Sequence, residues 1–319
     1  MRATMAALAV AMLFGASCGA GDDAGAGNET TTTTIPASGE FTALTYNVAG
    51  LPDILSGSNP EANMPHIARL LNDYELVLTQ EDWRTPDPNP IAPTRFYHEI
   101  LAEGSAHKYQ SESEPQPLGR DASRPTALLA DGLHYFSDFP LGDVTHVAWE
   151  SCFGDAETGA GDCLAFKGFS VVTMTLPGSI EVDVYNLHGE AGSTPEDQTL
   201  QHDDFEQLGN YIVENSDGRA IIFGGDTNLH TDIDPEDPQD AEDKQIWEEF
   251  LGVTGLTDVC DAVGCDEPGR IDKFAYRSND DVVLEATSWE FEIEKFQRDD
   301  GEPLSDHDAL AVTFRWETR

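Results

Sequence analysis

Short apolar runs that end in polar residues constrain the fold of this chain more than any other feature. The run at residues 220–223 leads into the sequence GGDTN at 224–228, and the sequence SDH at 305–307 precedes another run at 309–312. Runs of this length, bounded by turn residues, are typical of buried strands. We therefore expect carboxylate, amide and imidazole groups at strand ends, where a sheet can hold them rigidly.

The remaining periodicity predicts a mixed α/β domain. Strands are expected at residues 41–47, 75–80, 133–136, 168–176, 180–187, 220–223, 271–276, 282–286 and 309–314, and helices at 59–74, 199–213 and 245–251. The stretch at 82–125 is Pro-rich, polar and weak in such signals. Hairpins and crossovers both occur, so we expect one α/β (α+β) domain at 40–319, a four-layer α/β/β/α sandwich in which helices flank two packed mixed sheets.

The N-terminus is typical of an exported protein. Residues 6–14 form an apolar run too short to span a bilayer, followed by small residues and Cys18. This pattern resembles a bacterial lipoprotein signal, in which the cysteine is lipidated after cleavage, although Gly15 stands where a leucine is usual. A plain cleaved signal peptide at 1–18 is the alternative. Residues 19–39 are rich in Thr and Gly and predict a disordered tether.

The chain is strongly acidic, with 60 Asp and Glu against 17 Lys and Arg and a net charge of −43. Such a field repels nucleic-acid phosphates at long range, which argues against a nuclease unless a basic groove or bound cations override it. Adaptation of the surface to solubility or salt explains the charge without any specific partner.

Four of the five cysteines are expected to form disulfides. Apart from Cys18, these are Cys152, Cys163, Cys260 and Cys265, which allow three pairings. Closeness in sequence favours Cys152 with Cys163 and Cys260 with Cys265. A zinc site is less favoured, because spacings of eleven and five do not match the usual ligand pairs. An exported protein meets an oxidising compartment, where disulfides are the default.

Six motifs in order resemble those of the endonuclease/exonuclease/phosphatase superfamily of metal-dependent phosphoesterases. They are YNV at 46–48, QED at 80–82, NLH at 186–188, GDTN at 225–228, RIDK at 270–273 and SDH at 305–307. Within that superfamily the chain is most similar to secreted proteins related to sphingomyelinase C, through residues 47–52, 163–169 and 272–277. The match past His188 is looser, so the resemblance supports phosphodiester chemistry more firmly than it supports sphingomyelin as the substrate.

The resemblance implies a role for each polar residue of these motifs. Glu81, Asn47 (through its amide oxygen) and Asp306 would hold Mg²⁺ or another hard cation such as Mn²⁺ or Ca²⁺. His307 would be the general base, oriented by Asp272, and His188 would stabilise the phosphoryl group and assist the leaving group. Asp226 and Asn228 would orient the attacking water and bind phosphate or metal. Lys167 is a weaker candidate for holding the substrate phosphate.

The leading hypothesis is a secreted or surface-anchored bacterial phosphodiesterase that hydrolyses a phospholipid head group, and we expect it to be a monomer. An extracellular nuclease and a catalytically inactive binding module on the same scaffold are the alternatives. The nuclease should show basic residues near its site, and the binding module should have lost one of the His or carboxylate groups. The sequence retains all of them.

Overall fold

The computed structural model describes residues 37–51, 58–83, 97–112, 124–155, 158–232 and 238–319. All of them belong to one compact unit, Ile35–Arg319. The expected signal peptide, Cys18 and the tether up to residue 36 lie outside the described residues. Within the described part, no helix is both long and apolar enough to cross a membrane.

The first sheet has six strands in the order β11-β12-β1-β2-β4-β3. Their bounds are β1 Ser38–Asn47, β2 Leu76–Gln80, β3 Tyr109–Gln110, β4 His134–Ser137, β11 Val282–Phe291 and β12 Leu310–Thr318. Strands β1 and β2 are parallel, and Asn47 pairs with Gln80 at their ends. The register therefore brings Asn47 and the residue after β2, Glu81, to the same edge of the sheet.

The second sheet also has six strands, in the order β5-β6-β7-β8-β10-β9. Their bounds are β5 Thr145–Ala148, β6 Gly168–Leu176, β7 Ile180–His188, β8 Ala220–Asp226, β9 Thr257–Asp258 and β10 Asp272–Arg277. Asp226 pairs with His188 across a parallel ladder and with Asp272 across an antiparallel one. Three predicted site residues are thus neighbours on adjacent strands.

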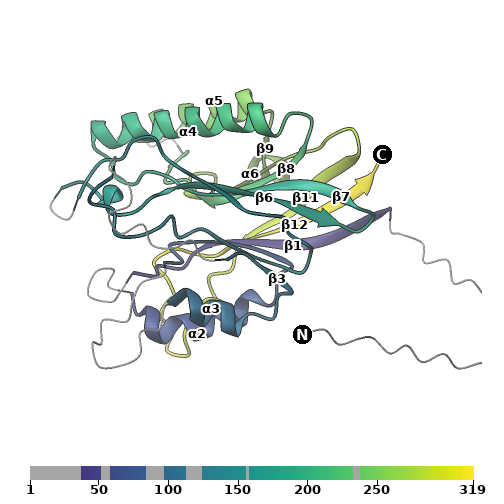
Figure 1. Ribbon diagram of the computed structural model, residues 1–319, viewed down its shortest axis with the longest axis horizontal. Helices are drawn as coiled ribbons and strands as arrows, with labels where there is room; N and C mark the ends of the chain where they lie inside the picture. The colour runs from purple at the N-terminus through teal and green to yellow at the C-terminus, as the bar shows by residue number, and fades with distance from the viewer. Residues whose placement is uncertain (1–36, 52–57, 84–96, 113–123, 156–157, 233–237) are drawn as a thin grey trace, which may run out of the picture. The chain divides into compact units, whose positions relative to one another are not determined.

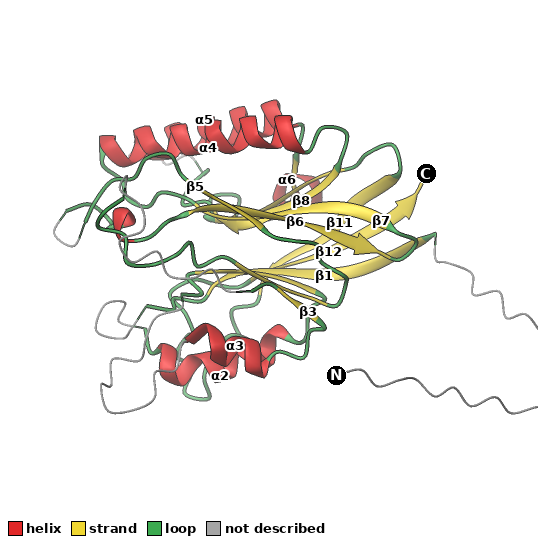
Figure 2. Cartoon of the chain, viewed as in Figure 1, coloured by secondary structure: helices red, strands yellow, loops and turns green. Residues whose placement is uncertain are grey.

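Helices cover the outer face of each sheet, as Figures 1 and 2 show. Helices α2 (Pro60–Leu71) and α3 (Tyr97–Gly104) lie on the first sheet, and α4 (Pro195–Asn215) and α5 (Pro238–Thr254) on the second. The short elements η1 (Asp162–Leu164) and α6 (Val259–Val263) complete the described secondary structure. One apolar core lies between each sheet and its helices, and a third, whose members include Phe41 and Trp316, fills the space between the sheets. The predicted sandwich of two helix-flanked sheets is confirmed.

Most predicted elements are present, and their differences have local causes. Helix α4 begins four residues earlier than expected, because Thr194 and Asp197 form a capping box and Pro195 suits the first turn. Helix α3 lies in the stretch that showed few element signals. It has only eight residues, and its stability comes from packing Tyr97, Ile100 and Leu101 into the core.

Both predicted disulfides are present. Cys152 bonds Cys163 across a sequence separation of 11, and Cys260 bonds Cys265 across a separation of 5. The first closes the loop that precedes Lys167, and the second ties α6 to the residue just after its C-cap, Gly264. The disulfides are compatible with an extracellular protein.

Candidate active site

Polar strand ends from the two sheets meet across the sandwich. The amide nitrogen of Asn47, at the end of β1, donates to Asp226 Oδ2 at 3.0 Å, at the end of β8. The same nitrogen donates to Glu81 Oε1 at 3.1 Å. One buried amide therefore joins carboxylates of both sheets, and its partner Asp226 lies 179 residues away in sequence.

Backbone geometry after β8 depends on a glycine at position 225. Gly225 has a φ of +147°, and a Cβ there would lie 2.3 Å from the carbonyl oxygen of Leu187. Only glycine tolerates both conditions. Because β8 can approach β7 so closely, Asp226 lies beside His188, with 3.5 Å between Asp226 Oδ2 and His188 Nε2.

The orientation of the Asn47 amide bears on its expected role as a metal ligand. Its oxygen accepts from the backbone N–H of Ala49 at 3.1 Å, while its nitrogen faces the two carboxylates. In this orientation Asn47 positions Glu81 and Asp226. Binding a cation through the oxygen requires turning the amide over, which breaks the bond to Ala49.

Glu81 carries a negative charge into a largely buried position. Its backbone φ is +50°, and its carbonyl oxygen accepts from Gly50 N–H at 3.0 Å. Burial raises the pKa of Glu81, and the carboxylates of Asp226 and Asp306 add to the effect against the opposing charge of Lys167. This environment favours either a proton or a cation on Glu81.

His307 is held by two carboxylates. Its Nδ1 lies 2.9 Å from Asp272 Oδ2, and its Nε2 lies 3.6 Å from Asp226 Oδ2. Burial alone would lower the pKa of His307, but the charges of Asp272 and Asp226 raise it to about 10. The contact with Asp272 leaves Nε2 directed toward Asn47 and Asp226, so His307 presents a strongly basic nitrogen to the site.

His188 has the opposite electrostatic environment. Burial, with the charges of Lys167 and His307, lowers its pKa well below the usual value. Its backbone carbonyl accepts from Trp149 Nε1 at 2.9 Å, which fixes the end of β7. The site therefore contains one basic and one neutral imidazole, each in contact with Asp226.

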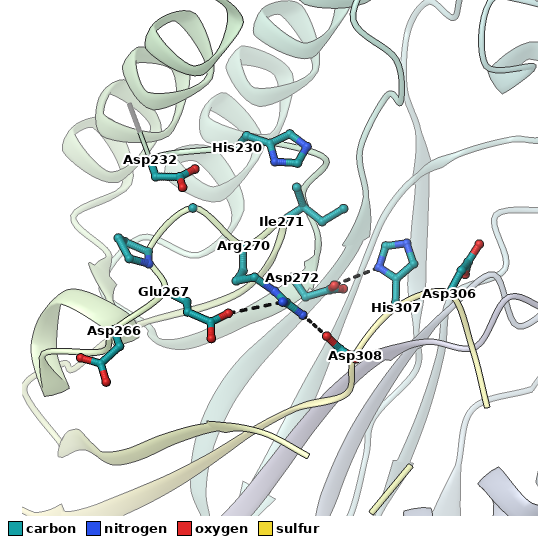
Figure 3. Close-up of a pocket in the computed structure, with 12 residues that line it drawn as sticks. His230, Asp232, Asp266, Glu267, Arg270, Ile271, Asp272, Asp306, His307 and Asp308 are labelled. Atoms are coloured by element: carbon teal, nitrogen blue, oxygen red, sulfur yellow. Dashed lines mark hydrogen bonds and ion pairs between the residues drawn. The ribbon is translucent and has the colours of Figure 1, made fainter. Parts of the chain in front are cut away.

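The remaining predicted residues surround this centre at different depths. Asn228, with a φ of +54°, donates from Nδ2 to Gly189 O at 3.2 Å, and its N–H donates to Asp226 Oδ1 at 3.0 Å. It thus positions Asp226 and the segment after His188. Asp306 is exposed and lies on the far side of His307 from Asp272, as Figure 3 shows.

Lys167 is buried behind the site. Its ammonium forms an ion pair with Asp162 and donates to Gly189 O at 3.1 Å. Burial would lower the pKa of Lys167, but Asp162 raises it above the usual value, so the side chain is charged. In this arrangement Lys167 supports the segment after His188 and supplies positive charge near Glu81 and Asp226.

Sequence reasoning missed three residues that position the site. Ser305 Oγ donates to Asn47 O at 2.7 Å and accepts from His307 N–H at 3.2 Å, so it joins the last motif to the first. Its place in the SDH motif was a usable signal. Trp149 and Asp162 hold His188 and Lys167, respectively, and no motif marks either of them.

A cavity of about 540 Å³ opens beside His307. Figure 3 shows its lining, in which six of the twelve residues are acidic. Arg270 is paired there with Glu267, at 3.3 Å, and with Asp308. The remaining carboxylates give the cavity a negative character that suits a cationic or zwitterionic group.

The residues at the centre fit a hard divalent cation. Asp226 is a buried carboxylate and Glu81 a partly buried one, both hydrogen-bonded by neutral Asn47, and burial raises the pKa of both. Oxygen donors of this kind suit Mg²⁺, Mn²⁺ or Ca²⁺. A cation bound between them would offset the negative charge that the fold concentrates there.

Comparisons with known proteins agree with this geometry. The chain is 34% identical over 305 residues to a sphingomyelinase of Mycobacterium bovis and, equally, to one of Mycobacterium tuberculosis. The match covers 89% of this chain and 54% of each relative, so the chain spans about half the length of these curated relatives. No family model matches the chain.

Solved structures with the same fold include three of particular interest. Sphingomyelinase C from Streptomyces griseocarneus has a TM-score of 0.57 at 17% identity, over 86% of this chain and 99% of that one. A Staphylococcus aureus beta toxin mutant with bound magnesium ions has a TM-score of 0.58 at 13% identity, over 86% and 99%. An endonuclease/exonuclease/phosphatase from Beutenbergia cavernae has a TM-score of 0.60 at 17% identity, over 86% and 71%. The chain is therefore a homologue of the mycobacterial sphingomyelinases over most of its length, with the fold of the endonuclease/exonuclease/phosphatase proteins.

Proposed function

We propose that this protein is an exported, Mg²⁺-dependent phosphodiesterase that hydrolyses the head-group phosphodiester of a phospholipid, in the manner of a sphingomyelinase. The observation that carries the proposal is the placement of His307, held by Asp272 at 2.9 Å with its Nε2 turned toward Asp226 and Asn47. A basic imidazole beside buried carboxylates is the arrangement that water activation next to a cation requires.

Each residue of the centre has a distinct task in this proposal. His307 accepts a proton from water, and Asp272 stabilises the imidazolium that results. Neutral His188 donates from Nε2 to a phosphoryl oxygen and assists the leaving oxygen. Asp226 and Asn228 orient the water. Glu81, with Asp226, Asn47 and Asp306 as candidate partners, would hold the cation, which supplies charge neutralisation on the phosphoryl and leaving oxygens.

The substrate class is supported by charge as well as by homology. Two proteins that are 34% identical to this chain over 89% of its length are named sphingomyelinases. The cavity beside His307 is lined by several carboxylates, and its one arginine is already paired. A zwitterionic head group meets attraction there, whereas a polyanionic strand meets repulsion. Phosphocholine and phosphoethanolamine lipids are therefore favoured over nucleic acids.

A substrate panel tests the proposal directly. Purified protein would be incubated with sphingomyelin vesicles, glycerophospholipid vesicles and supercoiled plasmid, each with excess Mg²⁺ or with EDTA. We expect release of a phosphorylated head group from at least one lipid, with loss in EDTA, and little nicking of plasmid. His307→Ala, prepared in parallel, controls for contaminating hydrolases. Plasmid nicking alone would support the nuclease, and cleavage of no substrate would support an inactive binding module.

Anchoring at Cys18 is a separate proposal. A protein lipidated there would act on lipids beside its own cell surface, and one released by a plain signal peptidase would act at a distance. Mass spectrometry of the mature N-terminus distinguishes the two.

A further inference from the structure

A second cluster of metal-ligating side chains lies apart from the catalytic residues. Asp82 follows Glu81 in sequence, His98 is the second residue of α3, and His134 is the first residue of β4. One ligand atom from each lies within 4.8 Å of the other two. All three residues are at most 5% exposed. None of them has a role in the catalysis described above.

The distances within this cluster resemble those between ligands of one ion. Asp82 Oδ2 lies 2.9 Å from His98 Nδ1 and 3.2 Å from His134 Nδ1. Ligands around tetrahedral Zn²⁺ with bonds of about 2.0–2.1 Å stand roughly 3.3 Å apart. The two imidazoles stack with centroids 3.8 Å apart and an interplanar angle of 24°.

Hydrogen bonds within the described residues do not account for the cluster. Asp82 Oδ2 is bonded by His98 and by Thr79 Oγ1, at 3.1 Å. Asp82 Oδ1 and both ring nitrogens of His134 are buried without a hydrogen-bond partner in the described structure. Leaving such groups unpartnered in a protein interior is costly. A buried imidazole that makes no hydrogen bond within the described residues, and whose only polar contact there is the one between Nδ1 and Asp82, is what a missing ligand would explain.

His107 is a buried histidine in the same layer whose ring nitrogens are both hydrogen-bonded, and it serves as a comparison for His134. It is 7% exposed and packs near Phe136, as His98 does. Both of its ring nitrogens have partners, Ser105 Oγ at 2.8 Å and Tyr74 O at 2.7 Å. The lack of hydrogen bonds at both ring nitrogens of His134 is therefore not a consequence of burial alone.

We propose that Asp82, His98 and His134 form a second metal site, specific for a borderline transition-metal ion such as Zn²⁺. Two imidazoles and one carboxylate suit Zn²⁺ and its neighbours better than Mg²⁺, which prefers oxygen donors. Three protein donors leave a coordination position for water. The ion would join segments that are 16 and 36 residues apart in the chain, across the Pro-rich stretch, and closing long loops in this way stabilises a fold.

Cobalt binding tests the proposal, since Co²⁺ is a coloured substitute for Zn²⁺. Tag-free full-length protein would be stripped with EDTA, dialysed, saturated with excess Mg²⁺ and titrated with Co²⁺ under visible absorption. We expect roughly one equivalent bound, with d–d bands of a site of low coordination number. His134→Ala and Asp82→Asn should each weaken this binding at least about tenfold, whereas His107→Ala should retain it. Zinc content by elemental analysis should follow the same order.

Two further measurements show where the ion binds and whether the variants are folded. His307→Ala should keep the cobalt spectrum, because a loss there would place the ion at Asp226, Asp272 and His307 and overturn the proposal. Thermal melts should show that Co²⁺ raises the midpoint of the wild type but not that of His134→Ala. His134→Gln serves where alanine impairs folding. Wild-type protein that binds no Co²⁺ once Mg²⁺ is present, or binding unchanged by His134→Gln, also overturns it.

Discussion

Replacing Asp272 by asparagine isolates the charge that makes His307 basic. The carboxylate lies 2.9 Å from His307 Nδ1 and is only 4% exposed, so water screens it little. An opposite charge at this range shifts a pKa by about 1–3 units, which corresponds to roughly 1.4–4 kcal/mol. Asparagine keeps the shape of the side chain and removes that charge. The pKa of His307 should therefore fall, and its imidazole should become a weaker base.

Two kinetic effects should follow from Asp272→Asn. A weaker base accepts the proton of water less readily, so kcat should fall by about 10–10³-fold. His307 is inactive as a base when protonated, and a lower pKa preserves its neutral form to lower pH. The acid limb of the kcat profile should therefore move toward lower pH by about 1–3 units. The assay is head-group release at saturating Mg²⁺ from the lipid that the wild type cleaves, measured from pH 5 to 11, because the pKa of His307 in the wild type is about 10.

Asp308→Asn is the matched control for this experiment. Asp308 lies one residue after His307 and pairs with Arg270, not with the imidazole. Its substitution removes the same charge from the same cavity without touching His307 directly. An acid limb that stays in place in Asp272→Asn, or that moves equally in Asp308→Asn, would refute the role assigned to Asp272.

Three further predictions concern metal, pH and covalent structure. Glu81→Ala should weaken Mg²⁺ binding in calorimetric titrations, and high Mg²⁺ should restore part of its lost activity, whereas EDTA should abolish wild-type turnover. Burial and the charge of Glu190 raise the pKa of Asp204 to about 9, so the folded protein keeps a proton that the unfolded protein loses above about pH 4. The stability of the wild type should therefore fall as the pH rises to 9. The gain in melting temperature from Asp204→Asn should be larger at pH 9 than at pH 5, and an equal gain at both would contradict this. Breaking the disulfide with Cys152→Ser should lower the free energy of unfolding in urea by roughly 3 kcal/mol, and a loss near zero would show that the loop is not constrained by it.

Local chemistry made much of the fold predictable. The strands that end at Asn47 and Asp226, and the one that precedes Glu81, were recognisable because apolar runs of strand length stop at polar residues. Both disulfides followed from closeness in sequence. Element boundaries were less accurate, since β8 extends through two glycines to Asp226 and β11 reaches Phe291. Ladder pairing with neighbouring strands, rather than local preference, decides where such strands end.

The sequence by itself determined which residue types the site would contain, because each motif carries its own carboxylate, amide or imidazole. Only the tertiary structure decided what these groups do to one another. Asp226 contacts Asn47 and His307 because the two sheets pack face to face, and it contacts His188 across neighbouring strands. The charges of Asp272 and Asp226 then raise the pKa of His307 against the effect of burial, whereas burial lowers that of His188. Two histidines of equal intrinsic basicity thus acquire opposite properties from the charges that long-range packing places beside them.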